Sequence, residues 1–333
     1  MNIIVFLPNW IGDVIMSLPF LKQLGEKTRN DSITILGQDW TKDILKHTKV
    51  KYNYDLILYN RTNYRTFKGF YNLIKQIKKN NYTHGFVLAE SFSSALLFRL
   101  SKIPNRIGYS TQGRSVFLNN AKRKELSLHR AQQFLSLLSN VSLNPNLNTT
   151  PKGLIGNVNK RQKNKTFKIG IHAHSQAQSR RWPLIYWIEI IKWCQNNNNI
   201  ISLFGNKEAT TISLKIIRIV NYISITDYCG KLSLENSINK MKECDLFISN
   251  DSGPMHIADS LGIPTIGLFG AGNFKETGLR SPYSINLTAN EYCSPCKKNY
   301  CLNKNDKLIC MNSLTPNIVI EKVDHYLKNG FLT

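Results

Sequence analysis

Acidic residues and long apolar segments are both scarce in this sequence. Its 333 residues include 21 Asp and Glu against 44 Lys and Arg, which gives a formal net charge of +23. Residues 1–166 carry 26 basic and 8 acidic residues, whereas residues 167–333 carry 18 and 13. A basic first half predicts an anionic partner for that half, and a generally Lys-rich surface is the alternative.

No stretch approaches the ~18–20 uninterrupted apolar residues that a membrane-spanning helix needs. The apolar start lacks a basic segment and is interrupted by Pro8, Asn9 and Asp13, which argues against a signal peptide. We therefore expect a cytoplasmic protein that charge can hold at a membrane surface. The seven cysteines are an odd count and indicate no simple disulfide framework.

Short apolar runs alternate with helical patterns, which predicts an α/β fold with parallel sheets. Strands are expected at residues 3–7, 32–36, 55–58, 85–88, 167–172, 200–204, 246–250 and 265–269. Helices are expected at residues 13–24, 67–79, 93–100, 128–138, 184–194, 208–220, 234–242, 254–261 and 316–327. Residues 144–165 lack apolar periodicity and are interpreted as a linker. Two doubly wound halves would place a ligand at the carboxyl ends of their strands, in a cleft between them.

The most informative motif is DLFISNDSGPMHIADSLG at residues 245–262. An apolar strand runs into Asp251, Ser252 and Gly253, and Pro254 stands near the start of the following helix. Asp or Ser suits the N-cap, and Gly lets another group approach the backbone. Free N–H groups at such a helix start bind anions, which suits a diphosphate. An ordinary capped helix is the alternative.

A second motif, LPNWIGDV at residues 7–14, also joins a strand to a helix. No Gly-Lys-Ser/Thr follows it, so it is not a Walker loop, and the three-glycine dinucleotide fingerprint is missing. Asp13 supplies a carboxylate that can accept a proton from an incoming hydroxyl group. Its alternative role is to cap the helix.

A third segment, residues 172–183, is a polar loop that carries Arg180 and Arg181. Arginine side chains suit phosphate oxygens. His172 and His174 are weak metal candidates because no third ligand is nearby, so we interpret them as ordinary polar loop residues.

Four cysteines near the end of the chain follow the pattern C-x2-C-x4-C-x8-C. Such a set can bind zinc or an iron–sulfur cluster, but reduced cysteines that pack a loop are the commoner outcome. We therefore predict no metal site, with a structural site as the alternative. The residues are Cys293, Cys296, Cys301 and Cys310.

Together these segments resemble the lipopolysaccharide heptosyltransferases of glycosyltransferase family 9, and within the family the heptosyltransferase II subgroup. The resemblance extends over nearly the whole chain. Its motifs are residues 7–21, Arg106-Ile-Gly-Tyr109, Gly113-Arg114, Arg181-Trp182-Pro183, Gly230-Lys231, residues 249–270 and the cysteine-rich stretch before Leu314-Thr315-Pro316.

The resemblance implies a GT-B fold of two Rossmann-like domains. Residues 1–160 would bind the acceptor, residues 161–315 would bind the nucleotide sugar, and a terminal helix at residues 316–333 would pack back toward the first domain. It implies an inverting transfer without a metal ion or other cofactor, from ADP-heptose to a lipid A–Kdo–heptose acceptor. The enzyme would be a monomer at the cytoplasmic face of the inner membrane and would bind no nucleic acid.

The resemblance also implies roles for residues. Asp13 would be the general base. The donor contacts would be Arg180, Glu208, Asp251, Ser252, Gly253, Pro254, Met255 and His256, with the backbone of 252–256 around the diphosphate and Glu208 on the ribose. The acceptor contacts would be Asn9, Trp10, Arg61, Arg65, Arg106 and Arg114.

Other functions remain as alternatives. A nucleic-acid-binding protein would explain the charge, but no recognisable nucleic-acid module is present. A nucleotide-sugar epimerase or dehydrogenase would need the absent glycine fingerprint and a Tyr-x-x-x-Lys pair. A family 9 enzyme with a different acceptor is a further possibility. Stabilisation by a nucleotide diphosphate and weak binding of duplex DNA at physiological salt would separate the first alternative from a transferase.

Overall fold

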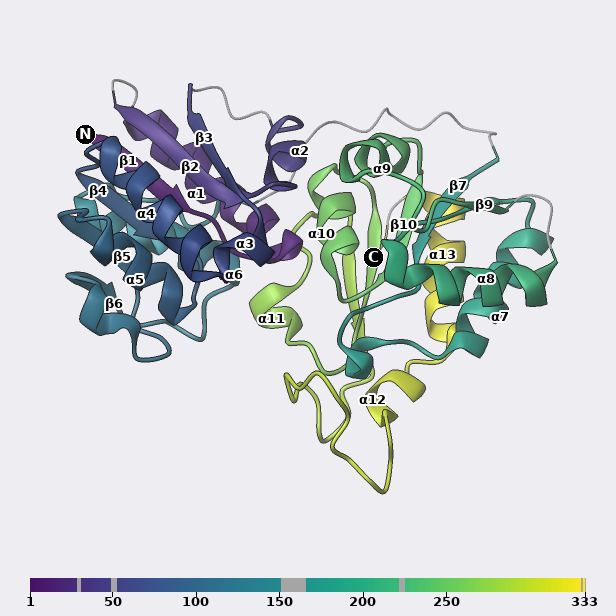
Figure 1. Cartoon of the computed structure of the whole chain (residues 1–333). Helices are drawn as coiled ribbons and strands as arrows, with labels where there is room; N and C mark the ends of the chain where they lie inside the picture. Colours follow the sequence, from purple (N-terminus) through teal and green to yellow (C-terminus); the bar gives the residue numbers. More distant parts are fainter. Residues whose placement is uncertain (29–30, 49–52, 151–165, 222–224, 331, 333) are drawn as a thin grey trace. The chain divides into compact units, whose positions relative to one another are not determined.

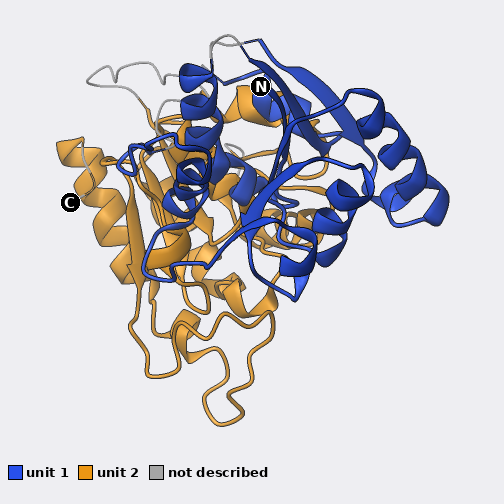
Figure 2. Ribbon diagram, turned by 90° about the vertical axis from the view of Figure 1, so that its left-hand side faces the viewer, with its two compact units in different colours: residues 1–154 blue, residues 155–333 orange. Residues whose placement is uncertain are grey.

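Two parallel sheets organise the chain, one in each half (Figure 1). The computed structural model describes residues 1–28, 31–48, 53–150, 166–221, 225–330 and 332. The chain forms two compact units, Met1–Leu154 and Ile155–Thr333, shown in different colours in Figure 2. The domain boundary expected between residues 160 and 161 lies outside the described residues, as does most of the expected linker.

In unit 1 the strand order is β3-β2-β1-β4-β5-β6, and every pairing is parallel. The strands are β1 (Asn2–Phe6), β2 (Ser32–Gln38), β3 (Asp55–Tyr59), β4 (His84–Val87), β5 (Asn105–Tyr109) and β6 (Asn120–Lys122). The helices are α1 (Ile11–Lys27), α2 (Thr41–Leu45), α3 (Arg61–Tyr64), α4 (Phe67–Lys79), α5 (Phe92–Leu100) and α6 (Arg130–Ser136), with 3-10 helices at Arg114–Phe117 and Leu137–Val141.

Unit 2 repeats this arrangement, with the parallel order β12-β11-β10-β7-β8-β9. Its strands are β7 (Lys168–His172), β8 (Ile200–Leu203), β9 (Ile225–Asp227), β10 (Leu246–Asn250), β11 (Thr265–Phe269) and β12 (Ile285–Thr288). Its helices are α7 (Leu184–Asn196), α8 (Thr210–Val220), α9 (Leu234–Met241), α10 (Gly253–Ser260), α11 (Phe274–Thr277), α12 (Ile309–Asn312) and α13 (Pro316–Asn329), with 3-10 helices at Gln178–Arg180 and Lys207–Ala209.

This strand order fixes where each unit can bind a ligand. The order of a doubly wound sheet reverses at one point, and ligands bind outside the carboxyl ends of the strands there. In unit 1 that point lies between β1 and β4, and in unit 2 it lies between β7 and β10. The segments that the sequence singled out follow β1, β7 and β10 directly.

Each sheet is covered by helices whose apolar residues recur at helical spacing. In α4, Leu73 and Ile77 are one turn apart and join the core beside β1 and β3. In α13, Val319, Val323 and Tyr326 are buried in the core of unit 2, and the Tyr326 hydroxyl donates a hydrogen bond to the Asp245 carbonyl oxygen. Unit 2 therefore buries the apolar face of α13 by itself. A return of this helix toward the first domain stays a prediction.

Of the twelve strands in the described residues, the sequence did not predict four, namely β5, β6, β9 and β12. The sequence of β5 is polar, with an arginine inside it, and the other three are short strands of three or four residues. Apolar alternation is weak in such strands, because pairing with an existing sheet rather than intrinsic pattern determines them. The stretch expected as one helix at 128–138 is α6 followed by a 3-10 helix.

Candidate active site

Asp13 lies in the first turn of α1, shortly after the end of β1. Trp10 is the residue before the helix and has extended backbone angles, so Asp13 occupies the third helical position and not the N-cap. The side chain is 25% exposed, and Oδ1 lies 3.9 Å from Nε of Arg130. The helix dipole favours a carboxylate at this position. A partly exposed carboxylate is thus available at the ligand-binding edge of the first sheet.

Arg130 joins this carboxylate to a second one. Glu90 follows β4, the other strand at the reversal point of the sheet. Arg130 Nη1 donates a hydrogen bond of 2.6 Å to Glu90 Oε1, and Lys124 Nζ donates one of 2.8 Å to the same oxygen. Neither Glu90 nor Arg130 was a predicted site residue. The available signal was a polar residue directly after the expected strand at residues 85–88.

Asn9 and Trp10, two predicted acceptor contacts in the loop before α1, differ in how accessible their side chains are to a ligand. Asn9 Oδ1 accepts a hydrogen bond of 3.0 Å from the Tyr59 hydroxyl, so its amide is used to hold the loop. The Trp10 side chain is 54% exposed, and the Arg61 guanidinium carbon lies 5.4 Å from its ring centroid. Arg65 is exposed at the end of α3. Trp10, Arg61 and Arg65 are therefore accessible to a ligand of unit 1.

Arg106 and Arg114, the two other predicted acceptor contacts, are both buried and donate hydrogen bonds to backbone carbonyls, so their acceptor role stays a prediction. Arg106 is 9% exposed, and its guanidinium donates to the carbonyls of Phe117 and Ile103. Arg114 is fully buried, and it donates to the carbonyls of Tyr109 and Ala89. Burial lowers the pKa of Arg114 to about 10, with Glu90 acting in the opposite direction. These arginines stabilise the end of the sheet.

In unit 2, Asp251 follows β10 and is buried. Its Oδ2 lies 3.1 Å from Nη1 of Arg180, whose side chain is 30% exposed. A side chain at Gly272 could not fit here, since a Cβ atom would lie 1.9 Å from Asp251 Oδ2. The carboxylate is therefore enclosed, and it holds the Arg180 guanidinium at the ligand-binding edge of the second sheet.

Helix α10 begins directly after this carboxylate. Ser252 is the N-cap residue with extended backbone, and Pro254 stands in the first turn, where its missing N–H costs nothing. Ser252, Gly253 and Pro254 are partly exposed, whereas the side chains of Met255 and His256 are buried. First-turn N–H groups have no partner within a helix and attract anions. Met255 and His256 can accordingly take part in anion binding only through their backbone.

The loop after β7 is hydrogen-bonded to the loop after β10. Ser175 Oγ donates to the Asp251 carbonyl at 3.3 Å, and Arg181 Nε donates to the Ser175 carbonyl at 2.6 Å. The Trp182 backbone N–H donates to Asn250 Oδ1 at 3.1 Å. Arg181 is thus a structural residue, and Arg180 is the one whose side chain reaches Asp251.

The two histidines of this loop have different surroundings. His172 is buried, and its Nδ1 lies 2.8 Å from the Phe204 carbonyl oxygen. Burial lowers the pKa of His172 to about 4, so the ring is neutral at pH 7. His174 Nε2 lies 3.8 Å from Oε2 of Glu208, and burial followed by the charge of Arg181 lowers the pKa of His174. Glu208 lies in the 3-10 helix after the neighbouring strand β8 and its side chain is 59% exposed, so its carboxylate is accessible.

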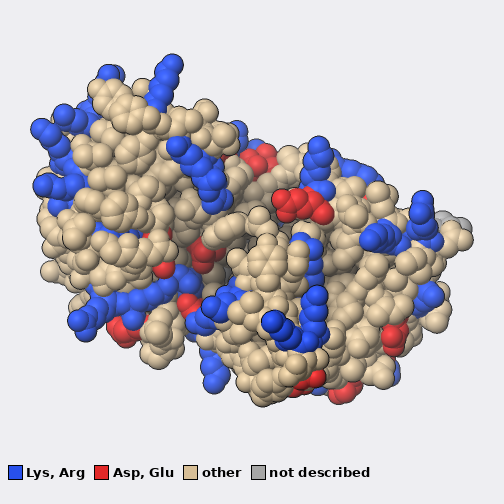
Figure 3. All heavy atoms as spheres, turned by 60° about the horizontal axis from the view of Figure 1, so that its bottom comes forward, with Lys and Arg blue, Asp and Glu red and all other residues tan. Residues whose placement is uncertain are grey.

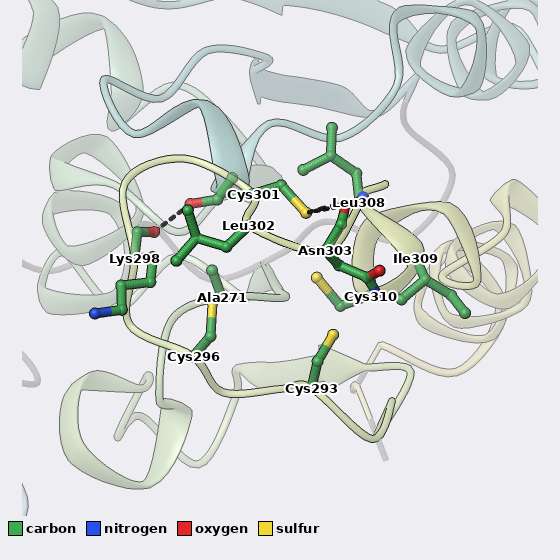
Figure 4. Close-up of a pocket in the computed structure, with 11 residues that line it drawn as sticks. Ala271, Cys293, Cys296, Lys298, Cys301, Leu302, Asn303, Leu308, Ile309 and Cys310 are labelled. Atoms are coloured by element: carbon green, nitrogen blue, oxygen red, sulfur yellow. Dashed lines mark hydrogen bonds between the residues drawn. The ribbon is translucent and has the colours of Figure 1, made fainter. Parts of the chain in front are cut away.

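Cys293, Cys296, Cys301 and Cys310 line one cavity of about 140 Å³ in unit 2 (Figure 4). Within the described parts of the chain, no group of three or more His, Cys, Asp or Glu side chains is already arranged as a metal site. Burial raises the pKa of the Cys310 thiol to about 11, and the three neighbouring thiols raise it further.

Comparison with known proteins identifies the class of this protein and then its family. The structure of Escherichia coli ADP-heptose lps heptosyltransferase II superposes with a TM-score of 0.79 over 99% of both chains, at 19% sequence identity. E. coli heptosyltransferase WaaC with ADP gives a TM-score of 0.74 over 98% of this chain and 99% of that one, at 16% identity. The protein therefore has the GT-B fold of these glycosyltransferases, as expected.

The sequence profile of glycosyltransferase family 9 (heptosyltransferase) matches residues 70–307, and the chain belongs to this family. The lipooligosaccharide heptosyltransferase 2 of Campylobacter jejuni is 25% identical over the whole of both chains. The lipopolysaccharide heptosyltransferase 2 of E. coli K12 is 22% identical over 81% of this chain and 83% of its own. The prediction of a family 9 glycosyltransferase is confirmed.

Proposed function

We propose that this enzyme transfers heptose from ADP-heptose to the inner-core heptose of lipopolysaccharide, with inversion at the anomeric carbon and without a catalytic metal ion. The names of its relatives support the sugar and the acceptor. The observation that carries the proposal is the start of α10, where partly exposed Ser252 and Gly253 adjoin Asp251 and its partner Arg180. The start of α10 is therefore suited to bind an anion. It lies at the ligand-binding edge of a doubly wound sheet, the kind of sheet that commonly binds nucleotides.

Unit 2 would bind the donor. The first-turn N–H groups of α10 would accept the diphosphate, and Arg180 would add a positive charge that Asp251 keeps in position. Glu208, in the 3-10 helix that follows β8, has an exposed carboxylate, which suits the ribose hydroxyls. As the bond between the anomeric carbon and the diphosphate oxygen breaks, the same donors would stabilise the negative charge of the leaving ADP. That charge stabilisation supports catalysis without a metal ion.

Unit 1 would bind the acceptor and supply the base. A hydroxyl oxygen of the acceptor would attack the anomeric carbon from the face opposite the diphosphate. Its proton would pass to the carboxylate of Asp13 as the new bond forms, while the bonding electrons leave with ADP. Attack from the opposite face inverts the configuration in one step.

Arg130 and Glu90 would position this base. Arg130 is 3.9 Å from Asp13 and 2.6 Å from Glu90, so Glu90 holds the guanidinium beside the carboxylate of Asp13. Trp10, Arg61 and Arg65 are accessible and are our candidates for contacts with the acceptor. Carboxylates and phosphates of a Kdo-bearing lipid A acceptor match the positive charge of unit 1. Lys and Arg side chains are prominent on the face drawn in Figure 3.

We further propose that the enzyme works as a monomer at the cytoplasmic face of the inner membrane. No helix in the described ranges is long and apolar enough to cross a bilayer. The outer face of α4 combines exposed Phe67 and Tyr71 with exposed lysines at positions 68, 75, 78 and 79. A helix with this combination adheres to anionic membrane surfaces.

The direct test uses purified enzyme, ADP-heptose and a panel of core acceptors truncated after Kdo, after the first heptose and after the second. We expect a mass increase of one heptose only on the acceptor that ends in the first heptose, and the opposite anomeric configuration in the product. The transfer should persist in the presence of a metal chelator at pH 7. Transfer only to the acceptor that ends in Kdo, or only with another nucleotide sugar, would contradict the assignment.

A further inference from the structure

His174 has a ring nitrogen that is buried and has no hydrogen-bond partner in the described part of the chain. The residue follows the end of β7 by two positions, and 12% of its side chain is exposed. Its Nε2 atom is shielded from solvent and makes no hydrogen bond among the described residues. A buried polar atom without a partner lowers stability, so such an atom in a folded protein calls for an explanation. The steps proposed above give this ring no role.

The carboxylate of Glu208 lies just beyond hydrogen-bond distance of this nitrogen. Nε2 of His174 is 3.8 Å from Oε2 of Glu208, whose side chain is largely exposed. In the described ranges of the chain, His174 is the one residue within ion-pair distance of this carboxylate. An exposed side chain loses conformational freedom when a ligand fixes it, which weakens binding unless the protein already holds the side chain. His174 is placed to hold the carboxylate of Glu208.

Other contacts fix the two backbone segments that carry these side chains. The hydroxyl of Ser175, the residue after His174, donates a hydrogen bond to the Asp251 carbonyl at 3.3 Å. Ala209, the residue after Glu208, is buried in the core of unit 2. The long and exposed side chain of Glu208 can therefore close the 3.8 Å gap by rotating its own bonds, without a shift of either backbone segment.

We propose that His174 is a positioning residue, which donates a hydrogen bond from Nε2 to the carboxylate of Glu208 and so orients it toward the ribose hydroxyls of the donor. The inference rests on the ribose contact proposed above for Glu208. Polar contacts that are long in a free enzyme often shorten when the ligand binds. Binding of the ribose fixes the carboxylate, and the same movement gives the buried Nε2 its missing partner.

The charge state of His174 and the lone pairs of the carboxylate agree with this arrangement. Burial, followed by the charge of Arg181, lowers the pKa of His174, and Glu208 acts in the opposite direction. The ring is therefore neutral at pH 7 and carries one N–H, which the proposal places on Nε2. A carboxylate has about four lone-pair sites, so it can accept from His174 and from both ribose hydroxyls together.

Calorimetry with ADP and 2′,3′-dideoxy-ADP on the full-length protein tests this role. The wild type should bind ADP at least about tenfold more tightly than the dideoxy nucleotide, since only ADP offers hydroxyls to Glu208. His174→Phe keeps a flat ring without an N–H donor. It should reduce the preference to about threefold or less and leave the affinity for dideoxy-ADP nearly unchanged. His174→Gln keeps an N–H donor and should retain most of the preference.

A double-mutant cycle with Glu208→Ala shows whether His174 acts through this carboxylate. In the Glu208→Ala background, His174→Phe should cause no further loss of ADP affinity, because the group that it positions is gone. An unchanged preference in His174→Phe, or an equal loss with and without Glu208, would overturn the inference. If His174→Phe does not fold, His174→Ala takes its place in the cycle.

Two further outcomes would overturn the inference at an earlier step and are distinguishable from the first. If Glu208→Ala keeps the wild-type preference for ADP, Glu208 does not bind the ribose. If the wild type binds neither nucleotide, the donor site proposed for unit 2 is wrong.

Discussion

Arginines that look equivalent in the sequence have opposite surroundings in the structure. Arg114 lies inside unit 1 and donates to the carbonyls of Tyr109 and Ala89, whereas Arg61 lies over the exposed ring of Trp10. A buried cation and its carbonyl partners must be replaced together, because an unmatched buried polar group costs about 1–3 kcal/mol. Charge alone therefore does not identify ligand contacts.

This contrast gives a paired prediction. Arg114→Met should lower the free energy of unfolding by about 2–4 kcal/mol, since several carbonyls lose their donors. Arg61→Ala should leave the free energy of unfolding within about 0.5 kcal/mol of the wild-type value. It should raise the acceptor KM without changing ADP affinity. Denaturant unfolding and acceptor kinetics on both variants provide the check. A stable Arg114→Met protein with a raised acceptor KM would restore Arg114 as a contact.

Gly253 begins α10 at the proposed diphosphate site. Gly253→Val would add a branched side chain where the anion must approach the backbone. ADP affinity should fall by at least about tenfold, or ~1.4 kcal/mol, and the melting temperature of the variant, measured alongside, serves as the control for helix stability. Calorimetry that finds unchanged ADP affinity in the valine variant would mean that the diphosphate binds elsewhere.

His172 predicts a pH dependence of stability. Burial lowers its pKa to about 4, whereas a histidine in the unfolded chain has a pKa of about 6.5. Between these values the unfolded chain binds more protons, so stability is present above pH 6.5 and declines as the pH falls toward 4. Between pH 7 and pH 5, the free energy of unfolding should fall by about 1–2 kcal/mol less in His172→Gln than in the wild type. Equal losses in urea titrations would contradict the burial of a neutral ring.

At the scale of elements, the sequence predicted the central strands because burial on both faces leaves continuous apolar runs, and the long helices because their apolar residues recur at helical spacing. Predicted residues 246–250, 265–269 and 67–79 coincide with β10, β11 and α4. The edge strand β6 and the polar strand β5 lacked that pattern. Their place depends on pairing with strands already in the sheet, as Ile107 pairs with Asn120.

Helix α4 carries the membrane prediction. Replacing Lys75, Lys78 and Lys79 with glutamate reverses the charge of its exposed face, while Leu73 and Ile77 stay buried. Binding to vesicles that contain anionic phospholipid should fall at least about tenfold, since each basic residue near such a surface contributes about 1 kcal/mol. The same three changes at Lys192, Lys215 and Lys242 of unit 2 provide a charge-matched control. Equal loss in both triple variants would indicate a nonspecific charge effect.

At the scale of the whole molecule, the sequence located the loops of the site but not the contacts within it. Asp13, Arg180 and Asp251 were singled out because they follow apolar strands. The ion pairs between Arg130 and Glu90, and between Arg180 and Asp251, join residues far apart in the chain. No local pattern encodes such a pair, because packing of the sheets determines which loops meet. For the same reason, the sequence does not reveal that the side chains of Arg106 and Arg114 are buried.

The central claim is that Asp13 accepts the proton of the acceptor hydroxyl. Its most direct test is the single-turnover rate of Asp13→Asn with saturating ADP-heptose and acceptor, since asparagine keeps the size but cannot act as the base. We expect a rate lower by about 10²–10⁴-fold, with ADP affinity and melting temperature nearly unchanged. A near-normal rate in this variant would exclude Asp13 as the base and leave it a structural residue of α1.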